Sequence, residues 1–387
     1  MNRPDDVRDL VSIPEMSAVL DSVPGQDAAM AFLRSAAERP HHAYVFAGPE
    51  GSGKSLAARA FAATLLCANG GCGECRDCRL ALRDQHPNEF IVEPEGRDIH
   101  VETIREDVWH PAYRTPPEPG RKVFLIREAD RLSPSAADTL LKVLEEPPAD
   151  AVFLLLSARA HELPETIWSR CHIVTFTALS ESFVVEQLVS EGVGAERARL
   201  AARLAGGNLG RARRMAVDPD GLAFRDAAIR ALELCGNGAA GALEAAELVV
   251  AAAADHKKGM SRELDEELAP FLDEKGRPEE AYRGSIRRIE TRFARRQRRA
   301  ERDFVDRVLL AASALLRDGI AAEAGASEAV LLNPDRRSAV GGHAVAVSVA
   351  GLGAIEEARA ALADDVNLNA RLVVERAFLQ VASRAAA

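Results

Sequence analysis

The sequence predicts an α/β P-loop domain with a parallel sheet, followed by an all-helical region. Short, uniformly apolar runs alternate with helical patterns over residues 1–177, which is typical of parallel strands buried on both faces. A glycine-rich turn follows the first of these runs. Beyond residue 177, alanine- and leucine-rich amphipathic segments dominate. Only 5% of the residues are aromatic, which disfavours a β-sandwich.

The α/β part contains clear helix and strand signals. One helix is expected from Lys54 to about Leu66. A second is expected over Ser133–Glu146, because Ser133 suits the N-cap, Pro134 suits the first helical position and Pro147 ends the helix. The expected strands are Ala43–Gly48, Lys122–Arg127, Val152–Leu156 and Ile173–Phe176.

The composition changes after the α/β part, and three segments are expected: 1–177, 178–217 and 218–387. A charged stretch at about 255–302 looks like an insertion in the last of them. Within it, Arg283–Arg302 holds nine arginines on a helical pattern. These arginines either contact a nucleic-acid backbone or pair with the acidic residues of Glu263–Glu274. Ala322–His343 is expected to be a loop because it is rich in glycine.

Charge and hydropathy exclude several classes of protein. The formal net charge is −10, so the whole chain would not seek DNA without a local basic patch or a partner. No apolar run approaches the ~18 residues that a membrane span needs. The first thirty residues contain no apolar signal-peptide segment. We therefore expect a soluble, cytoplasmic protein with no membrane partner.

The glycine-rich turn Gly48–Ser55 fits the pattern G-x-x-x-x-G-K-S in full. Its position after a strand and before a helix lets backbone N–H groups surround phosphate oxygens at a helix N-terminus. Lys54 would contact the β- and γ-phosphates and Ser55 would ligate Mg²⁺, which predicts ATP with Mg²⁺ as a ligand. The alternative is a loop that keeps this shape without binding nucleotide. The expected glycines of the site are Gly48, Gly51 and Gly53.

The strand that normally supplies a Mg²⁺ ligand is altered. An aspartate is expected directly after this strand, but Arg127 occupies that position. Glu128 keeps the position that would polarise an attacking water. Asp130 would face the same side as Glu128 on an extended chain, and would substitute through a water. We therefore expect weak Mg²⁺ binding and weak or absent ATP hydrolysis. Arg127 itself either forms a simple ion pair or suppresses catalysis.

Four cysteines cluster after the first helix, with the spacing C-x4-C-x2-C-x2-C. Four thiolates with tight glycine turns suit a tetrahedral zinc ion, which we expect to be structural. An iron–sulfur cluster is the alternative. Two further cysteines, Cys171 and Cys235, are expected in the core. The expected zinc ligands are Cys67, Cys72, Cys75 and Cys78.

Several motifs together resemble bacterial DNA polymerase III clamp-loader subunits of the AAA+ class. The resemblance covers roughly residues 15–215 and includes the phosphate loop and the cysteine cluster. The string LLKVLEEPP, followed about twenty residues later by Ser169-Arg170-Cys171, is its most specific part. The motifs are Val23–Gln26, His42–Tyr44, Gly48–Ser55, Leu140–Pro148 and Ser169–Cys171.

The resemblance implies a role for several single residues. Gly25 and Gln26 would lie beside the adenine, and Ser157 would be the polar sensor near the γ-phosphate. Arg211 would be the sensor arginine of the helical segment. Arg170 would project into the nucleotide site of a neighbouring subunit as an arginine finger, where a planar guanidinium suits transition-state charge.

The resemblance also implies an architecture and a function. Residues 178–217 would form a lid, and 218–387 a collar that joins five subunits in a ring with gamma/tau and delta subunits. The chain would help to load a sliding clamp onto primed DNA and would donate Arg170 to a neighbour. The alternative is a gamma/tau-type motor that hydrolyses ATP in its own site, which Arg127 argues against.

Overall fold

The computed structural model describes residues 18–385, apart from 95–97, 218–220, 273–281, 328–329, 334, 336–344 and 365–368. The chain divides into two compact units. Unit 1 contains residues 1–49, 53–92 and 100–177, and unit 2 contains 50–52, 93–99 and 178–387. Among the described residues, no helix is long and apolar enough to cross a membrane.

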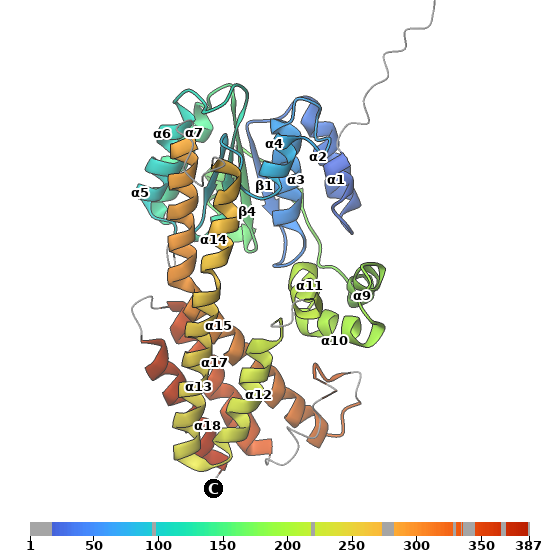
Figure 1. Cartoon of the computed structure of the whole chain (residues 1–387), viewed down its shortest axis with the longest axis vertical. Coiled ribbons are helices and arrows are strands. Elements are labelled where there is room, and N and C mark those ends of the chain that lie inside the picture. Colours follow the sequence, from blue (N-terminus) through green and yellow to red (C-terminus); the bar gives the residue numbers. More distant parts are fainter. Residues whose placement is uncertain are drawn as a thin grey trace, which may run out of the picture. The chain divides into compact units, whose positions relative to one another are not determined.

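Unit 1 is built on a five-stranded sheet with the order β2-β3-β4-β1-β5, and each pair of neighbours is parallel. In Figure 1, α1 to α4 lie on one face of this sheet and α5 to α7 on the other, as expected for strands buried on both sides. The strands are β1 (Ala43–Ala47), β2 (Glu89–Val92), β3 (Lys122–Ile126), β4 (Ala151–Ser157) and β5 (His172–Thr175).

The prediction of four strands missed β2 at one edge of the sheet. This strand has four residues and begins with a glutamate, so it gives little apolar signal. A row of stacked rings fixes it, because Phe90 stacks on Phe124 of β3, which stacks on Phe153 of β4, with centroids 4.9 Å apart in both pairs. Cross-strand aromatic pairs of this kind stabilise neighbouring strands.

The helices of unit 1 begin and end close to the positions that the sequence predicts. Ser133 caps α7, because its hydroxyl accepts a hydrogen bond from the Ala136 N–H. The predicted first long helix is α3. The helices are α1 (Ala18–Asp21), α2 (Asp27–Glu38), α3 (Lys54–Leu66), α4 (Arg76–Ala81), α5 (Val101–Ile104), α6 (His110–Ala112), α7 (Pro134–Glu145) and α8 (Glu165–Trp168), with a short π-helix η1 (Arg105–Trp109) and the 3₁₀ turns η2 (Ala129–Arg131) and η3 (Ala160–Glu162).

Unit 2 begins with three helices that share a small core. They are α9 (Glu181–Ser190), α10 (Ala195–Ala205) and α11 (Leu209–Val217). The buried side chains of this core are mostly alanine and leucine, and Met215 lies among them. Short helices with such small contact residues pack closely, which agrees with the helical character predicted for this stretch.

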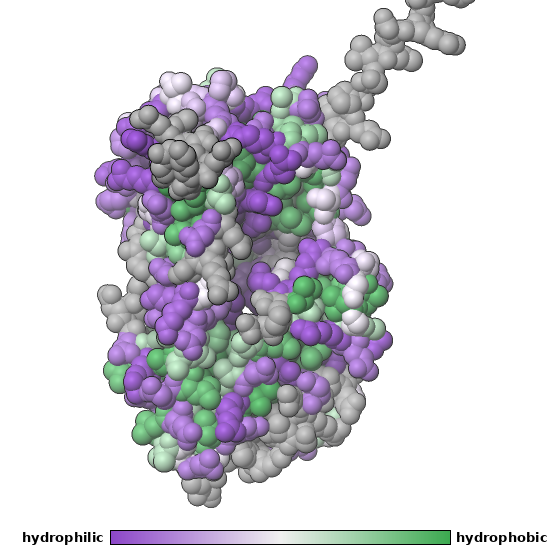
Figure 2. All heavy atoms as spheres, viewed as in Figure 1, coloured by the Kyte–Doolittle hydropathy of each residue, from purple (hydrophilic) through white to green (hydrophobic). Residues whose placement is uncertain are grey.

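The rest of unit 2 is a helical bundle with an alanine-rich core. Close packing is visible at Gly241, where a Cβ atom would lie 2.0 Å from the carbonyl oxygen of Leu234, so only glycine fits. In Figure 2, hydrophobic and hydrophilic residues are interspersed over the visible face of this bundle. Its helices are α12 (Ala223–Cys235), α13 (Gly238–Gly259), α15 (Arg283–Glu323), α17 (Val345–Asp364) and α18 (Ala370–Ala385).

The arginine-rich segment forms the first half of α15, a helix of 41 residues. Its apolar stripe is buried, including Ile289 and Phe293. Arg292 and Arg296 both pair with Glu267 of α14 (Ser261–Leu268), at 3.2 and 2.7 Å. A short turn, η4 (Ala269–Phe271), follows α14. Pairing with nearby acids is therefore confirmed for these two arginines. Half of the loop predicted at 322–343 lies outside the described residues, and its first two residues, Ala322 and Glu323, belong to α15 instead.

Candidate functional site

The phosphate loop connects β1 to α3 at the carboxyl edge of the sheet. Gly51 and Gly53 both have a positive φ, 77° and 93°, which glycine adopts without strain. Gly48 lies against Phe176, whose carbonyl oxygen would be 2.3 Å from an added Cβ atom. The Lys54 ammonium donates to the carbonyl oxygens of Gly48 and Pro49, at 2.5 and 2.6 Å. The loop thus has the strand–turn–helix setting that the motif requires, with Ser55 in the first turn of α3.

Ser157 lies beside the start of this loop. It ends β4 opposite Ala47 of β1, and its carbonyl oxygen accepts a hydrogen bond from Gly48 N–H at 3.3 Å. Its hydroxyl donates to Asp130 Oδ1 at 2.8 Å, and Arg159 pairs with the other oxygen of that carboxylate at 3.1 Å. Asp130 is therefore held by a hydroxyl and a guanidinium.

Arg127 follows β3 at the same edge and forms an ion pair. Its Nη2 lies 2.5 Å from Asp84 Oδ2, and the other Asp84 oxygen lies 3.1 Å from Arg59 Nε on α3. The side chain of Asp84 is only 12% exposed, so its charge depends on these two guanidiniums. Asp84 follows α4 and takes a left-handed backbone conformation, with φ of 61°. The prediction that Arg127 forms a simple ion pair is therefore confirmed.

These residues do not fit a bound Mg²⁺. The ion needs oxygen ligands with octahedral geometry, usually a carboxylate together with the loop hydroxyl. Each nearby carboxylate faces an arginine instead: Asp84 faces Arg127, Asp130 faces Arg159, and Glu128 pairs with Arg131 at 3.0 Å.

The expectation that Asp130 shares a face with Glu128 on an extended chain was wrong. Residues Ala129–Arg131 form a 3₁₀ turn, and Glu128 has a φ of 50°. The chain bends directly after β3, so the period of two that an extended strand would give does not apply. Asp130 is turned to Ser157 as a result.

Three other expected nucleotide-site residues occupy defined positions. The Gln26 amide bridges to the end of unit 1, donating to Thr177 O at 2.8 Å and accepting from Thr177 N–H at 3.2 Å. Gly25, just before it, has a φ of 73°. Arg211 lies on α11 in unit 2, and its N–H donates to the side chain of Asn208 at 2.9 Å.

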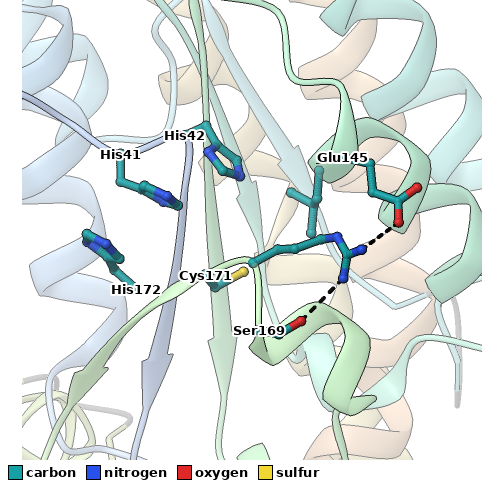
Figure 3. A pocket seen from close by; sticks show the side chains of 8 residues that line it. His41, His42, Glu145, Ser169, Cys171 and His172 are labelled. Atoms are coloured by element: carbon teal, nitrogen blue, oxygen red, sulfur yellow. Dashed lines mark hydrogen bonds and ion pairs between the residues drawn. The ribbon is translucent and has the colours of Figure 1, made fainter.

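Arg170 lies at the amino edge of the sheet, two residues before β5. Its Nη2 pairs with Glu145 at the end of α7, at 2.7 Å, and its Nη1 donates to Thr166 O and to Ser169 Oγ. Dashed lines in Figure 3 mark the contacts with Glu145 and Ser169. Its side chain is 35% exposed and that of Glu145 45%, so this pair contributes only about 0–1 kcal/mol and separates at little cost.

Three histidines border the same pocket, which has a volume of about 530 Å³. The His41 ring stacks on His172 at 4.2 Å and lies 4.1 Å from the His42 ring (Figure 3). Burial, and then the charges of His41 and His172, lower the pKa of His42. Burial and His41 lower the pKa of His172. Cys171 also lines the pocket, and burial raises its pKa to about 12, so it is a thiol rather than a reactive thiolate.

The four clustered cysteines come together at the end of α3 and the start of α4. Cys67 Sγ lies 3.8 Å from Cys72 Sγ and 3.6 Å from Cys75 Sγ, and the four sulfurs all lie within 4.8 Å of one another. A tetrahedral zinc ion with bonds of about 2.3 Å separates its sulfurs by about 3.8 Å, so this set fits a single ion. The fourth sulfur belongs to Cys78.

Hydrogen bonds change the pKa of one of the clustered thiols in the direction that favours metal binding. Burial opposes ionisation of Cys67, but N–H groups of Cys72, Gly71 and Asn69 outweigh it and lower the pKa of Cys67 to about 7. Burial raises the pKa of Cys78. The cluster thus presents one thiol that ionises readily, as metal binding needs, and one that an ion would have to deprotonate.

A second group of ligand-type residues lies nearby and is better explained as an ion-pair network. It consists of Asp77, His86 and Glu118. His86 Nδ1 accepts the Asn88 N–H at 3.1 Å, so in the neutral ring Nε2 carries the proton and faces Asp77 at 3.6 Å. Arg76 pairs with Glu118 at 3.1 Å.

Sequence reasoning missed four residues that shape these two edges. Asp84 and Arg59 hold Arg127, and Glu145 and His172 border Arg170. Only Glu145 left a signal, because it belongs to the LEEPP string. The contacts of Asp84 with Arg127 and Arg59 join segments far apart in the chain, which no local pattern reveals.

The sheet order, the phosphate loop after β1 and the helices that follow define a P-loop α/β module of the AAA+ class. Residues 25–180 match the family model described as "DNA polymerase III, delta subunit". This stretch, about two fifths of the chain, is therefore similar to that family.

Curated relatives include several subunits of DNA polymerase III. DNA polymerase III subunit delta' of Bacillus subtilis is 33% identical over 43% of this chain and 51% of its own length. The delta' subunit of Pseudomonas aeruginosa is 41% identical over 39% of this chain and 47% of its own length. The chain thus spans about half the length of these relatives. The tau/gamma subunit of Haemophilus influenzae is 39% identical over 39% of this chain and 22% of its length.

Among solved structures, a DNA polymerase III gamma subunit-related protein of Thermotoga maritima is similar over 93% of this chain and all of its own. The sequence identity is 17% and the TM-score is 0.45.

Proposed function

We propose that the chain acts as the delta' subunit of a DNA polymerase III clamp loader. In this role it helps to load the sliding clamp onto primed DNA and donates Arg170 to the ATPase site of a neighbouring subunit. Residues 1–177 would be its AAA+ domain, 178–217 its lid and 218–387 its collar. Its partners would be gamma/tau and delta subunits in a five-membered ring, with clamp and primer–template DNA reached through the complex.

The position of Arg170 supports a role in trans. The phosphate loop lies at the carboxyl ends of the strands, whereas Arg170 precedes β5 at their amino ends. β1 has five residues, so about 16 Å of strand separates the two edges. Arg170 therefore cannot contact a phosphate held by its own loop. Its weak, half-exposed ion pair with Glu145 leaves it available to a phosphate of another subunit.

The chain's own phosphate site supports a role without turnover. The position of the metal-binding aspartate is occupied by Arg127, and a hydrolytic site needs its metal to neutralise developing charge. Glu128, the residue expected to polarise water, is paired with Arg131. We infer that the chain contributes no ATP hydrolysis of its own, and that the cysteine cluster holds one structural zinc ion.

The test is a loader reconstituted with the Arg170→Ala variant. DNA- and clamp-stimulated ATP turnover and clamp loading are measured against the wild-type loader. An arginine finger contributes about 10³–10⁵ in rate at the site it serves. We expect clamp loading to fall at least tenfold. Total turnover falls by a smaller factor if the remaining sites fire independently.

A matched control is available in Arg213→Ala. Arg213 also pairs with one glutamate, Glu191, at 2.5 Å, and its side chain is 39% exposed. This control should load clamps like the wild type. Arg170→Lys should not restore loading, because an ammonium lacks the planar fork of a guanidinium. Wild-type turnover and loading with Arg170→Ala would reject the proposed role.

A further inference from the structure

We propose that the phosphate loop of this chain binds nucleotide without a divalent cation, with the Arg127 guanidinium in place of the metal. The ligand class is the free polyphosphate of ADP or ATP. This inference concerns the chain's own site and is independent of the role proposed for Arg170.

The loop itself has the features needed to bind phosphate. Backbone N–H groups of a positive-φ glycine turn, a helix N-terminus and the Lys54 ammonium all lie between β1 and α3. None of these groups requires a metal to contact an oxygen. The carboxylates near the loop therefore do not fit Mg²⁺, but the groups that would bind phosphate oxygens are all present.

Positive charge is held directly after β3 by an ion-pair network. Arg127 follows β3, where the Mg²⁺ ligand of a P-loop site normally lies, and Asp84 ties it to Arg59. Arg59 is four residues after Ser55 on α3, so the two lie on the same face of the helix, one turn apart. A cation ligated by Ser55 would have to approach two guanidiniums that share one carboxylate, and like charges would repel it.

The same charges favour an anion. A guanidinium carries its charge at any accessible pH and presents donors to phosphate oxygens. Asp84 holds the Arg127 guanidinium in place through a contact of 2.5 Å, so little side-chain freedom is lost when phosphate binds. Mg²⁺ in solution neutralises part of the charge of ATP or ADP. Added Mg²⁺ is therefore expected to leave affinity unchanged or to lower it.

The experiment is a calorimetric titration of the full chain with ADP in metal-depleted buffer and in 5 mM Mg²⁺. No chelator is used, because a chelator would also remove zinc from the cysteine cluster. We expect ADP to bind in metal-depleted buffer, with an affinity equal to or up to threefold tighter than in Mg²⁺. Tenfold tighter binding in Mg²⁺, or no binding in either buffer, would overturn the inference.

Two variants sharpen the test. Arg127→Gln should lose about tenfold in metal-free ADP affinity, and an unchanged affinity would count against the inference. In a double variant, Arg127→Asp supplies the missing carboxylate. Asp84→Asn removes the negative charge that would repel this new carboxylate. In this variant Mg²⁺ should tighten ADP binding at least tenfold.

A matched control is Arg359→Gln. Arg359, on α17, pairs with Asp306 at 3.0 Å, and its side chain is 25% exposed against 19% for Arg127. The Arg359→Gln variant should bind ADP with the affinity of the wild type in both buffers. Thermal melts show whether each variant folds. If Arg127→Gln does not fold, the double variant still tests the proposal.

Discussion

At the carboxyl edge of the sheet, Arg127 shares the buried carboxylate of Asp84 with a second arginine, while at the amino edge Arg170 is half-exposed and holds a surface glutamate. The first arginine is costly to move because its partner would remain buried and charged. The second separates from its partner at a cost of about 0–1 kcal/mol. One sheet thus carries an arginine that is fixed against a buried carboxylate and another whose ion pair separates easily.

The largest expected effect concerns ATP turnover by the isolated chain, because turnover would contradict the difference between the two edges. We expect a rate at least 100-fold below ~1 s⁻¹, the low end of ordinary enzyme turnover numbers, because Arg127 occupies the metal position. Phosphate release by the purified chain measures it. A rate near 1 s⁻¹ would favour the gamma/tau-type motor and remove the asymmetry between the two edges.

The next largest effect is expected from the cysteine cluster. Cys75→Ser should abolish metal binding and lower the melting temperature by about 5–10 °C, corresponding to a loss of about 2–3 kcal/mol. Elemental analysis should find one zinc ion per wild-type chain and none in the variant. Cys235→Ala, at an isolated buried cysteine, is the control and should keep its zinc. Iron, or a metal-free wild type, would contradict the assignment.

A smaller effect should separate the two edges in the isolated chain. Lys54→Ala should lower ADP affinity about tenfold, since a hydrogen bond to a charged group contributes about 1.5–3 kcal/mol. Arg170→Ala should leave ADP affinity within twofold of the wild type, because it lies at the opposite edge. Titration of both variants measures this. A tenfold loss with Arg170→Ala would show that the two edges are coupled.

The smallest effect is a dependence of stability on pH at the amino edge. The folded-state pKa values of His42 and His172 lie below the usual value, chiefly because of burial. The stability that the neutral rings provide is therefore present above about pH 6.5 and is lost as the pH falls below it. Melting temperatures at pH 7.5 and 5.5 should differ less in His42→Gln than in the wild type or in His110→Gln, at an exposed histidine. An equal difference in all three would exclude these rings as the source.

Local patterns predicted the parts of the fold that local interactions determine. The phosphate loop, the Ser133 cap and the cysteine cluster each depend on residues within about twelve positions of one another. The sequence also identified Arg127 as a departure from the usual order. It could not supply Asp84, which lies 43 residues away and contacts Arg127 only through the fold. Strand β2 was missed for a similar reason, since its stacking partners come from other strands.

The chain segment that carries Asp84 begins inside the cysteine cluster. Cys78 lies on α4, and Asp84 follows that helix by three residues, with its carboxylate against Arg127 and Arg59. Occupancy of the cluster and occupancy of the phosphate loop therefore belong to one thermodynamic cycle. Whatever factor zinc contributes to the affinity for an anion, the anion contributes the same factor to the affinity for zinc. The two sites are joined by the 13 residues of α3, which span about 20 Å of helix.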